Sequence, residues 1–207
     1  MLETRVVLLD EVLSAHAGAL GADFEGYRNH AYRVANFCLA LTSTSTTAGE
    51  EERIAKIAFA AAFHDLGIWT DATFDYLPPS NRLANAYLAE TGRSGWAPDI
   101  SEMILQHHKL TPFRGRCALV EPFRRADLID VSHGLASFGL RREFLRKAFA
   151  QWPGALFGIP GIRFPWSGSD VRESWRRRAA PTGVSSVGAG NGDRTRDFHL
   201  GKVALYR

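Results

Sequence analysis

The stretch "AFAAAFHDLGIWT" (residues 58–70) ends a run of small and aromatic apolar residues with a His-Asp pair, His64 and Asp65. Ile54, Ile57 and Ala61 precede His64 at the helical period, so we expect His64 on the core-facing side of a helix. A buried imidazole or carboxylate is unfavourable unless it is paired or bound to a cation. The pair therefore predicts a compensating partner from another part of the chain.

Helical periodicity dominates the first 150 residues. Apolar residues follow the 3.6-residue period across residues 24–41, with His30 at the edge of the stripe. The polar run "TSTSTTAG" (residues 42–49) breaks this pattern, and a later helix is expected from about Val120 to His133. No stretch shows useful strand-like alternation. The sequence predicts an all-α helical domain over residues 1–150.

Short local patterns predict where several of these helices begin and end. The segment "GIWTDATFDYLPPS" (residues 67–80) is expected to be a loop, because its glycine and its Pro-Pro pair oppose helix continuation. Hydroxyl and carboxylate side chains that can satisfy free backbone N–H groups predict helix starts. The expected signals are Thr47 with Glu50, Asp99 with Glu102, Ser80 as a start, and Gly92 as a stop.

Composition is typical of one soluble globular domain. The 207 residues are 45% hydrophobic and 23% charged, and no apolar run approaches the roughly 20 residues that span a bilayer. The N-terminus lacks a signal-peptide pattern, so a cytoplasmic location without membrane contact is expected. Cys38 and Cys117 cannot form a disulfide framework. Oligomeric state does not follow from these features.

The net charge of +3 is unevenly distributed. Residues 140–207 carry 13 Lys or Arg and 5 Asp or Glu, whereas residues 1–139 carry 12 and 17. The basic character therefore belongs to the tail and not to the predicted helical domain. No nucleic-acid partner is therefore expected from the net charge.

Polar, titratable residues recur on otherwise apolar faces of four predicted helices. Because burying them separately is unfavourable, their convergence predicts one shared divalent cation. A mixed set of imidazoles and carboxylates suits Mn, Fe, Co, Ni, Zn or Mg and selects none of them. His16, His133 and His199 are read as ordinary histidines. The recurring groups are His30, then His64 with Asp65, then His107 with His108, and finally Asp127 with Asp130.

The ordered segments "NHAYRVANFCLAL", "AFAAAFHDLG", "LQHHK" and "FRRADLIDVS" together resemble the HD superfamily of metal-dependent phosphohydrolases, over roughly residues 24–135. That family is all-α, and its metal is held by a His, a later His-Asp pair and a final Asp. The resemblance assigns the metal ligands to His30, His64, Asp65 and Asp127, with Asp130 as the alternative last ligand.

The resemblance also implies a mechanism. In the family, the metal lowers the pKa of a bound water that attacks phosphorus in a small phosphorylated metabolite or a nucleotide. Asp65 would be both ligand and proton acceptor. Arg33, His107 and Lys109 are the predicted substrate-binding residues, with His107 in that role at a one-metal site.

One position departs from the family pattern. Several nucleotide-cleaving relatives carry an acidic residue three positions beyond the His-Asp pair, where this chain has Ile68. Asp71, with Asp75 as another candidate, is predicted to take the catalytic role instead. A hydratase or lyase similar to cyanamide hydratase, and a non-catalytic protein that keeps the motif, are the alternatives to a phosphohydrolase.

The C-terminal residues carry a different kind of pattern. Back-translation of Asp193–Thr195, Leu200–Lys202 and Ala204–Arg207 yields, in order, complements of the T arm, anticodon loop and D arm of a glycine transfer RNA. We therefore interpret residues 188–207 as a tail read through an antisense tRNA gene, the alternative being an ordinary Gly-rich tail. Residues 151–187, dense in Gly and Pro, are interpreted as an irregular, frameshifted segment.

Overall fold

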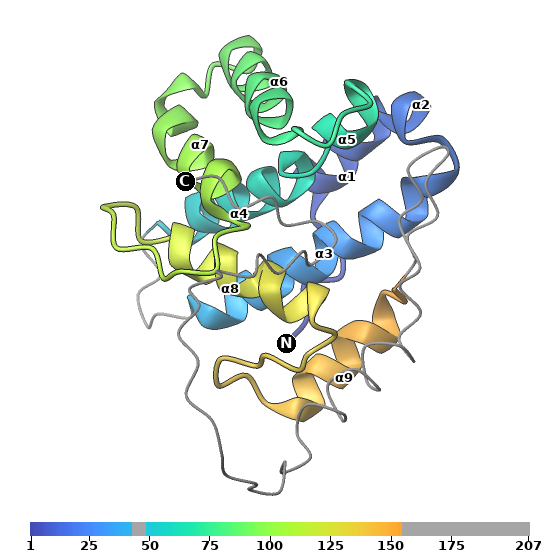
Figure 1. Cartoon of the computed structure of the whole chain (residues 1–207), viewed down its shortest axis with the longest axis vertical. Helices are drawn as coiled ribbons and strands as arrows, with labels where there is room; N and C mark the ends of the chain where they lie inside the picture. Colours follow the sequence, from blue (N-terminus) through green and yellow to red (C-terminus); the bar gives the residue numbers. More distant parts are fainter. Residues whose placement is uncertain (43–48, 155–207) are drawn as a thin grey trace, which may run out of the picture. The chain divides into compact units, whose positions relative to one another are not determined.

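The computed structural model describes residues 1–42 and 49–154, which all belong to one compact unit (Figure 1). These residues form α-helices and short 3-10 helices (η), with no strand among them, which confirms the all-α prediction. In chain order the elements are α1 (Val7–Ala15), α2 (Ala17–Leu20), η1 (Gly21–Asp23), α3 (Phe24–Leu41), α4 (Glu50–Phe63), α5 (Gly67–Thr70), α6 (Leu77–Glu90), η2 (Ser94–Trp96), α7 (Ala97–Gln106), α8 (Val120–Val131) and α9 (Arg142–Gln151).

Helix α3 is the central element of this unit. It contacts α1, α4, α8 and α9, with its most extensive contacts to α8, and Figure 1 shows it crossing the middle of the helices. Every residue from Asn29 to Cys38 is buried. A helix buried on all sides is ordinarily apolar all round, yet this segment contains two asparagines, a histidine and an arginine. Each of these polar groups therefore requires a partner inside the protein.

The start of α6 differs from the prediction for Ser80. The helix begins at Leu77, and Pro78 and Pro79 occupy its first turn. Backbone N–H groups in the first turn have no intrahelical partner, so proline, which lacks an N–H, loses no hydrogen bond there. Ser80 lies inside the helix, and its hydroxyl accepts a hydrogen bond from the backbone N–H of Gly67 at 2.9 Å. The side chain therefore joins two segments and does not cap its own helix.

The predicted caps of α7 and α4 also differ. Helix α7 begins at Ala97 and has no side-chain cap, because the Asp99 carboxylate is 2.9 Å from the Lys56 ammonium on α4. The N-cap of α4 is Gly49, and Thr47 lies outside the described residues. Tertiary contact has taken the place of the expected local bond at α7.

The expected loop between the His-Asp pair and α6 is shorter than predicted. Residues 67–70 form the single turn α5, so that only residues 71–76 connect α5 to α6. Helix α6 ends at Glu90, and Gly92 follows with a φ of +69°, as the predicted stop requires. Figure 1 places α5 and α6 on the same side of α3 as the end of α4.

The described part of the chain ends just beyond the predicted domain boundary at residue 150. Trp152 is 3% exposed and belongs to the same hydrophobic core as α3. The interpretations of residues 151–187 as frameshifted and 188–207 as antisense-derived fall, beyond residue 154, outside the described residues. Among the described helices, none combines the length and apolar character needed to cross a bilayer.

Candidate metal centre

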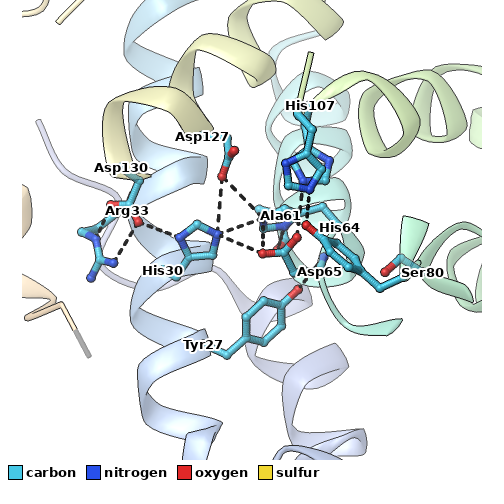
Figure 2. Close-up of polar contacts among 12 residues, drawn as sticks. Tyr27, His30, Arg33, Ala61, His64, Asp65, Ser80, His107, Asp127 and Asp130 are labelled. Atoms are coloured by element: carbon cyan, nitrogen blue, oxygen red, sulfur yellow. Dashed lines mark hydrogen bonds and ion pairs between the residues drawn. The ribbon is translucent and has the colours of Figure 1, made fainter. Parts of the chain in front are cut away.

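Five buried imidazole and carboxylate side chains from different segments converge at one place beside α3 (Figure 2). Each of these residues is between 0% and 6% exposed. They come from α3, from the turn that follows α4, from the residue after α7, and from α8. They are His30, His64 with Asp65, His107 and Asp127.

The atoms that face the centre of this cluster are close together. His30 Nε2 lies 2.9 Å from His64 Nε2 and 3.6 Å from Asp127 Oδ1. Asp65 Oδ2 lies 3.8 Å from His30 Nε2 and 3.7 Å from His64 Nε2. His107 Nε2 lies 3.3 Å from the other oxygen of Asp65. The cluster thus has two nitrogens and two oxygens around one point, with a third imidazole beside Asp65.

The outer nitrogen of each imidazole has a partner that fixes the ring. His64 Nδ1 is 2.9 Å from the Ala61 carbonyl oxygen, and His107 Nδ1 is 2.7 Å from that of Ile104. His30 Nδ1 is 2.6 Å from the Asp130 carboxylate. Since carbonyl and carboxylate oxygens only accept hydrogen bonds, each Nδ1 carries the proton and donates it. In the neutral rings, every Nε2 lone pair therefore faces the cluster.

This arrangement suits a cation better than it suits the side chains alone. In the Nδ1–H tautomers, the Nε2 lone pairs of His30 and His64 face each other at 2.9 Å, and the carboxylates of Asp65 and Asp127 add negative charge nearby. Bonds of about 2.0–2.2 Å to one metal place neighbouring ligand atoms about 3 Å or more apart. The observed separations lie in that range. These buried groups can hold a metal ion.

Burial and nearby charges shift the pKa values of residues in and beside the cluster. Burial lowers the pKa of His64 well below its ordinary value, so the ring is neutral, which is the form that binds metals. Burial raises the pKa of Asp127 to about 6. Burial also acts on Asp130, but the charge and hydrogen bonds of Arg33 outweigh it and hold the pKa of Asp130 well below its usual range. Asp130 is therefore a fixed carboxylate.

The turn that carries His64 and Asp65 is held by backbone contacts. The Tyr27 hydroxyl donates to the Ala62 carbonyl at 3.0 Å and accepts from the Asp65 N–H at 3.2 Å. A Cβ atom at Gly67 would lie 2.5 Å from the Tyr76 carbonyl oxygen, so only glycine fits there. In the "HDLG" sequence, the polar pair is thus followed by a glycine that allows the start of α6 to pack closely against the turn and hold it in place.

The structure gives Arg33 a different environment from the predicted substrate contact. Its side chain is 3% exposed, and its guanidinium contacts Asp130 and the Trp152 carbonyl. Asp130, the alternative last ligand, faces Nδ1 of His30 instead of the cluster centre. These contacts do not support a substrate-binding role for Arg33. Figure 2 shows Asp130 beside His30, on the side away from His64 and Asp65.

The other predicted substrate and catalytic residues lie in more exposed positions. Lys109 is exposed and directly follows the His107–His108 pair. Asp71 is exposed, and its carboxylate lies 2.8 Å from Arg82 and 2.9 Å from the Thr70 hydroxyl. His107 reaches the cluster through Asp65. Of the predicted residues outside the ligand set, His107 is therefore the one that the structure brings to the centre.

Two tyrosines at the site were not predicted. Tyr27 lies one turn before His30 on α3, and this helical spacing could have identified it. Tyr76 lies in the connection before α6, where no periodicity places it, and its hydroxyl forms a hydrogen bond with His108 Nε2. Burial, with the nearby charges of Asp65 and Asp127, raises the pKa of Tyr76 well above its ordinary value. Its phenol is therefore a neutral hydrogen-bonding group at neutral pH.

Comparison with known proteins adds no assignment to this geometry. No family model, curated protein or solved structure matches the chain significantly. The resemblance to the HD superfamily therefore stays a prediction from the ordered motifs, and the geometry shows that these buried groups can hold a metal ion.

Proposed function

We propose that this protein is a metal-dependent hydrolase with one divalent cation held by His30, His64, Asp65 and Asp127. The observation that carries the proposal is the set of inward-facing Nε2 atoms and carboxylate oxygens, each Nδ1 being engaged by a carbonyl or by Asp130. When bound, a divalent cation supplies Lewis-acid chemistry, lowering the pKa of water and stabilising charge on a phosphoryl oxygen.

The two oxygens of Asp65 support its proposed double role. Oδ2 lies near the nitrogens of His30 and His64, whereas Oδ1 lies near His107. In hydrolysis, water oxygen bonds to phosphorus as the bond to the leaving oxygen breaks. The proton lost by water passes to Asp65, and the leaving oxygen takes up one proton. His107, next to Asp65, is suited to orient the substrate or the water.

The charge of the neighbouring loop supports an anionic substrate. Residues 107–119 include Lys109, Arg114 and Arg116 but no Asp or Glu, and these three basic residues are exposed. A loop of this kind attracts a phosphorylated metabolite or nucleotide toward the cluster. Lys109 is the best placed of the three because it follows the two histidines directly.

A hydratase or lyase is the second candidate function, favoured by the third residue beyond the His-Asp pair. Ile68 is apolar and 4% exposed, at the position where nucleotide-cleaving HD proteins carry an acid. A hydratase similar to cyanamide hydratase would use the same cluster for water addition without a phosphate leaving group. A protein that binds a metal, releases no phosphate from any substrate tested and hydrates a nitrile would favour this candidate.

Elemental analysis of the purified chain tests the metal centre directly. Stoichiometric divalent metal is expected in the wild type, and loss of it is expected in His64→Ala and Asp65→Ala with helical circular dichroism retained. His16→Ala is the matched control, because His16 contacts the Val12 carbonyl and lies outside the cluster. Equal metal content in all four proteins would refute the centre. A phosphate-release panel on the metal-bound protein then tests the hydrolase proposal.

A further inference from the structure

A continuous chain of buried polar contacts leads away from His30 on the side opposite to the other cluster residues (Figure 2). His30 Nδ1 contacts Asp130 Oδ2 at 2.6 Å, and the two Asp130 oxygens accept from Arg33 Nε at 2.5 Å and Nη2 at 2.9 Å. The remaining Arg33 nitrogen, Nη1, donates to the carbonyls of Trp152 at 2.7 Å and Pro153 at 3.3 Å. Three helices, α3, α8 and α9, thus meet around one guanidinium.

We propose that Arg33 and Asp130, held by the carbonyls at the end of α9, form a positioning unit that sets the tautomer and ring orientation of His30. The inference rests on the proposed function, in which His30 is a metal ligand. Neither residue would touch the metal. They act through His30, whose Nε2 faces His64 and Asp127 only in the ring orientation that Asp130 fixes.

Asp130 is suited to this task by its position. It lies on α8, the helix with the most extensive contacts to α3, and its side chain is 5% exposed. A carboxylate that accepts from Nδ1 keeps the proton there and leaves the Nε2 lone pair for a cation. Because α8 also supplies Asp127, one helix carries a proposed ligand and the support of another ligand one turn apart.

Arg33 is suited to hold Asp130 in place. It lies three residues after His30 on α3, so both side chains leave the same face of that helix. Its planar fork binds both carboxylate oxygens and leaves a third nitrogen for the α9 carbonyls, a pattern that lysine cannot reproduce. The guanidinium also compensates the charge of the buried carboxylate.

The end of α9 completes the unit. Trp152 is the C-cap of α9, and its ring stacks on Tyr32 with a centroid distance of 5.2 Å. Asn29 donates a hydrogen bond to the Pro153 carbonyl at 3.2 Å. Carbonyls at a helix C-terminus carry partial negative charge and therefore suit a cationic side chain. The chain from Trp152 to Pro153 thereby supports a site that it does not line.

The full-length double variant Arg33→Met/Asp130→Leu tests this inference. Apolar residues of similar volume often replace a buried ion pair without loss of stability, so the helical fold is expected to persist. Affinity for added Zn²⁺ or Mn²⁺, measured by calorimetry, is expected to fall about 10–100-fold, the usual effect of losing such support. In the metal-free protein, ¹H–¹⁵N correlation spectra should show the His30 ring changing from the Nδ1–H tautomer to a mixture.

Arg28→Met/Asp10→Leu is the matched control, an ion pair between α3 and α1 in which Arg28 Nε lies 2.9 Å from Asp10. It is expected to leave both readouts unchanged. If the test variant unfolds, Asp130→Asn, which preserves shape but not charge, provides the same two readouts. Unchanged Zn²⁺ affinity and an unchanged His30 tautomer in a folded variant would overturn the inference. A wild type that binds neither metal would overturn the proposed function, and the tautomer would still decide the positioning role.

Discussion

On one side of the cluster, His30 is backed by Asp130 and Arg33, whose side chains are 5% exposed or less. On the other side, His107 continues into His108 and a loop rich in exposed basic residues. The first side lies among α3, α8 and α9, and its polar atoms have short contacts within the protein. The second side is half-buried at His108 and meets solvent at Lys109. We infer that the buried side holds a cation, and that the loop side receives the substrate.

The largest expected difference between the two sides is in metal affinity. His30→Gln removes a proposed ligand on the buried side and should weaken Zn²⁺ binding more than about 100-fold, beyond the range for outer residues. His108→Gln on the loop side should change the affinity far less, because His108 is half-buried and hydrogen-bonds with Tyr76. Calorimetric titration of both variants measures the contrast. Equal losses of affinity would show that His108 is itself a ligand, and the two sides of the cluster would then not differ in metal binding.

A change at Gly67 tests how rigidly the His-Asp turn must be held. In Gly67→Ala, the new Cβ would lie 2.5 Å from a backbone oxygen and 2.8 Å from Pro79 Cβ, so the backbone must move. Such overpacking is expected to reduce the free energy of unfolding by about 1–3 kcal/mol. Gly18→Ala is the control, because Gly18 also lies in a four-residue helix and a Cβ added there would have no atom within 4 Å. Chemical denaturation measures both; equal stabilities would contradict the locked turn.

Asp127 and Asp130 lie one turn apart on α8, and their pKa values are shifted in opposite directions. The dependence of stability on pH therefore provides a further test. Because burial raises the pKa of Asp127 to about 6, the folded protein holds this proton more tightly than the unfolded chain does. Its contribution to stability is therefore complete below about pH 4 and is lost as the pH rises through about 6.

Thermal denaturation in a metal chelator between pH 4 and pH 7 measures this contribution. Relative to Asp127→Asn, the wild type should lose stability as the pH rises through that interval. Added divalent metal should oppose the loss, because it binds the deprotonated carboxylate. Parallel pH profiles for the two proteins would show that Asp127 does not titrate in this range.

The smallest expected effect is that of Tyr76→Phe on the loop side. The substitution removes the hydroxyl that bonds to His108 and should reduce the free energy of unfolding by about 1 kcal/mol. Zn²⁺ affinity is expected to fall less than about tenfold, below the usual loss for residues that orient a ligand. Calorimetry and chemical denaturation give both values. A loss as large as that of Arg33→Met/Asp130→Leu would mean that the loop side also positions ligands.

Local patterns in the sequence, together with the family resemblance, predicted that the proposed ligands lie together. His64 and Asp65 are adjacent, and His30 and Asp127 each lie on a helix whose apolar period points them inward. Helical period indicated that these polar groups converge, whereas the resemblance to the HD superfamily selected the four proposed ligands and preferred Asp127 to Asp130. The all-α fold was confirmed. The metal and the reaction stay predictions.

The contacts that the sequence did not predict are those that depend on distant segments. Arg33 was expected at a substrate because it lies one turn from His30. Its partner Asp130 lies 97 residues away, and nothing local indicates that pairing. Ser80 and Asp99 were expected to cap helices, but Gly67 and Lys56 bind them instead. A hydroxyl or carboxylate near a helix start has several possible partners, and only the tertiary packing selects among them.

The position of Trp152 has a consequence for the order in which the contacts of the folded protein form. Arg33 and the Trp152 carbonyl are separated by 119 residues, so this contact can form only after the end of α9 has been synthesised. Because contacts of high sequence separation carry a large loop-closure cost, we expect α9 to dock late in folding, after the earlier helices have assembled.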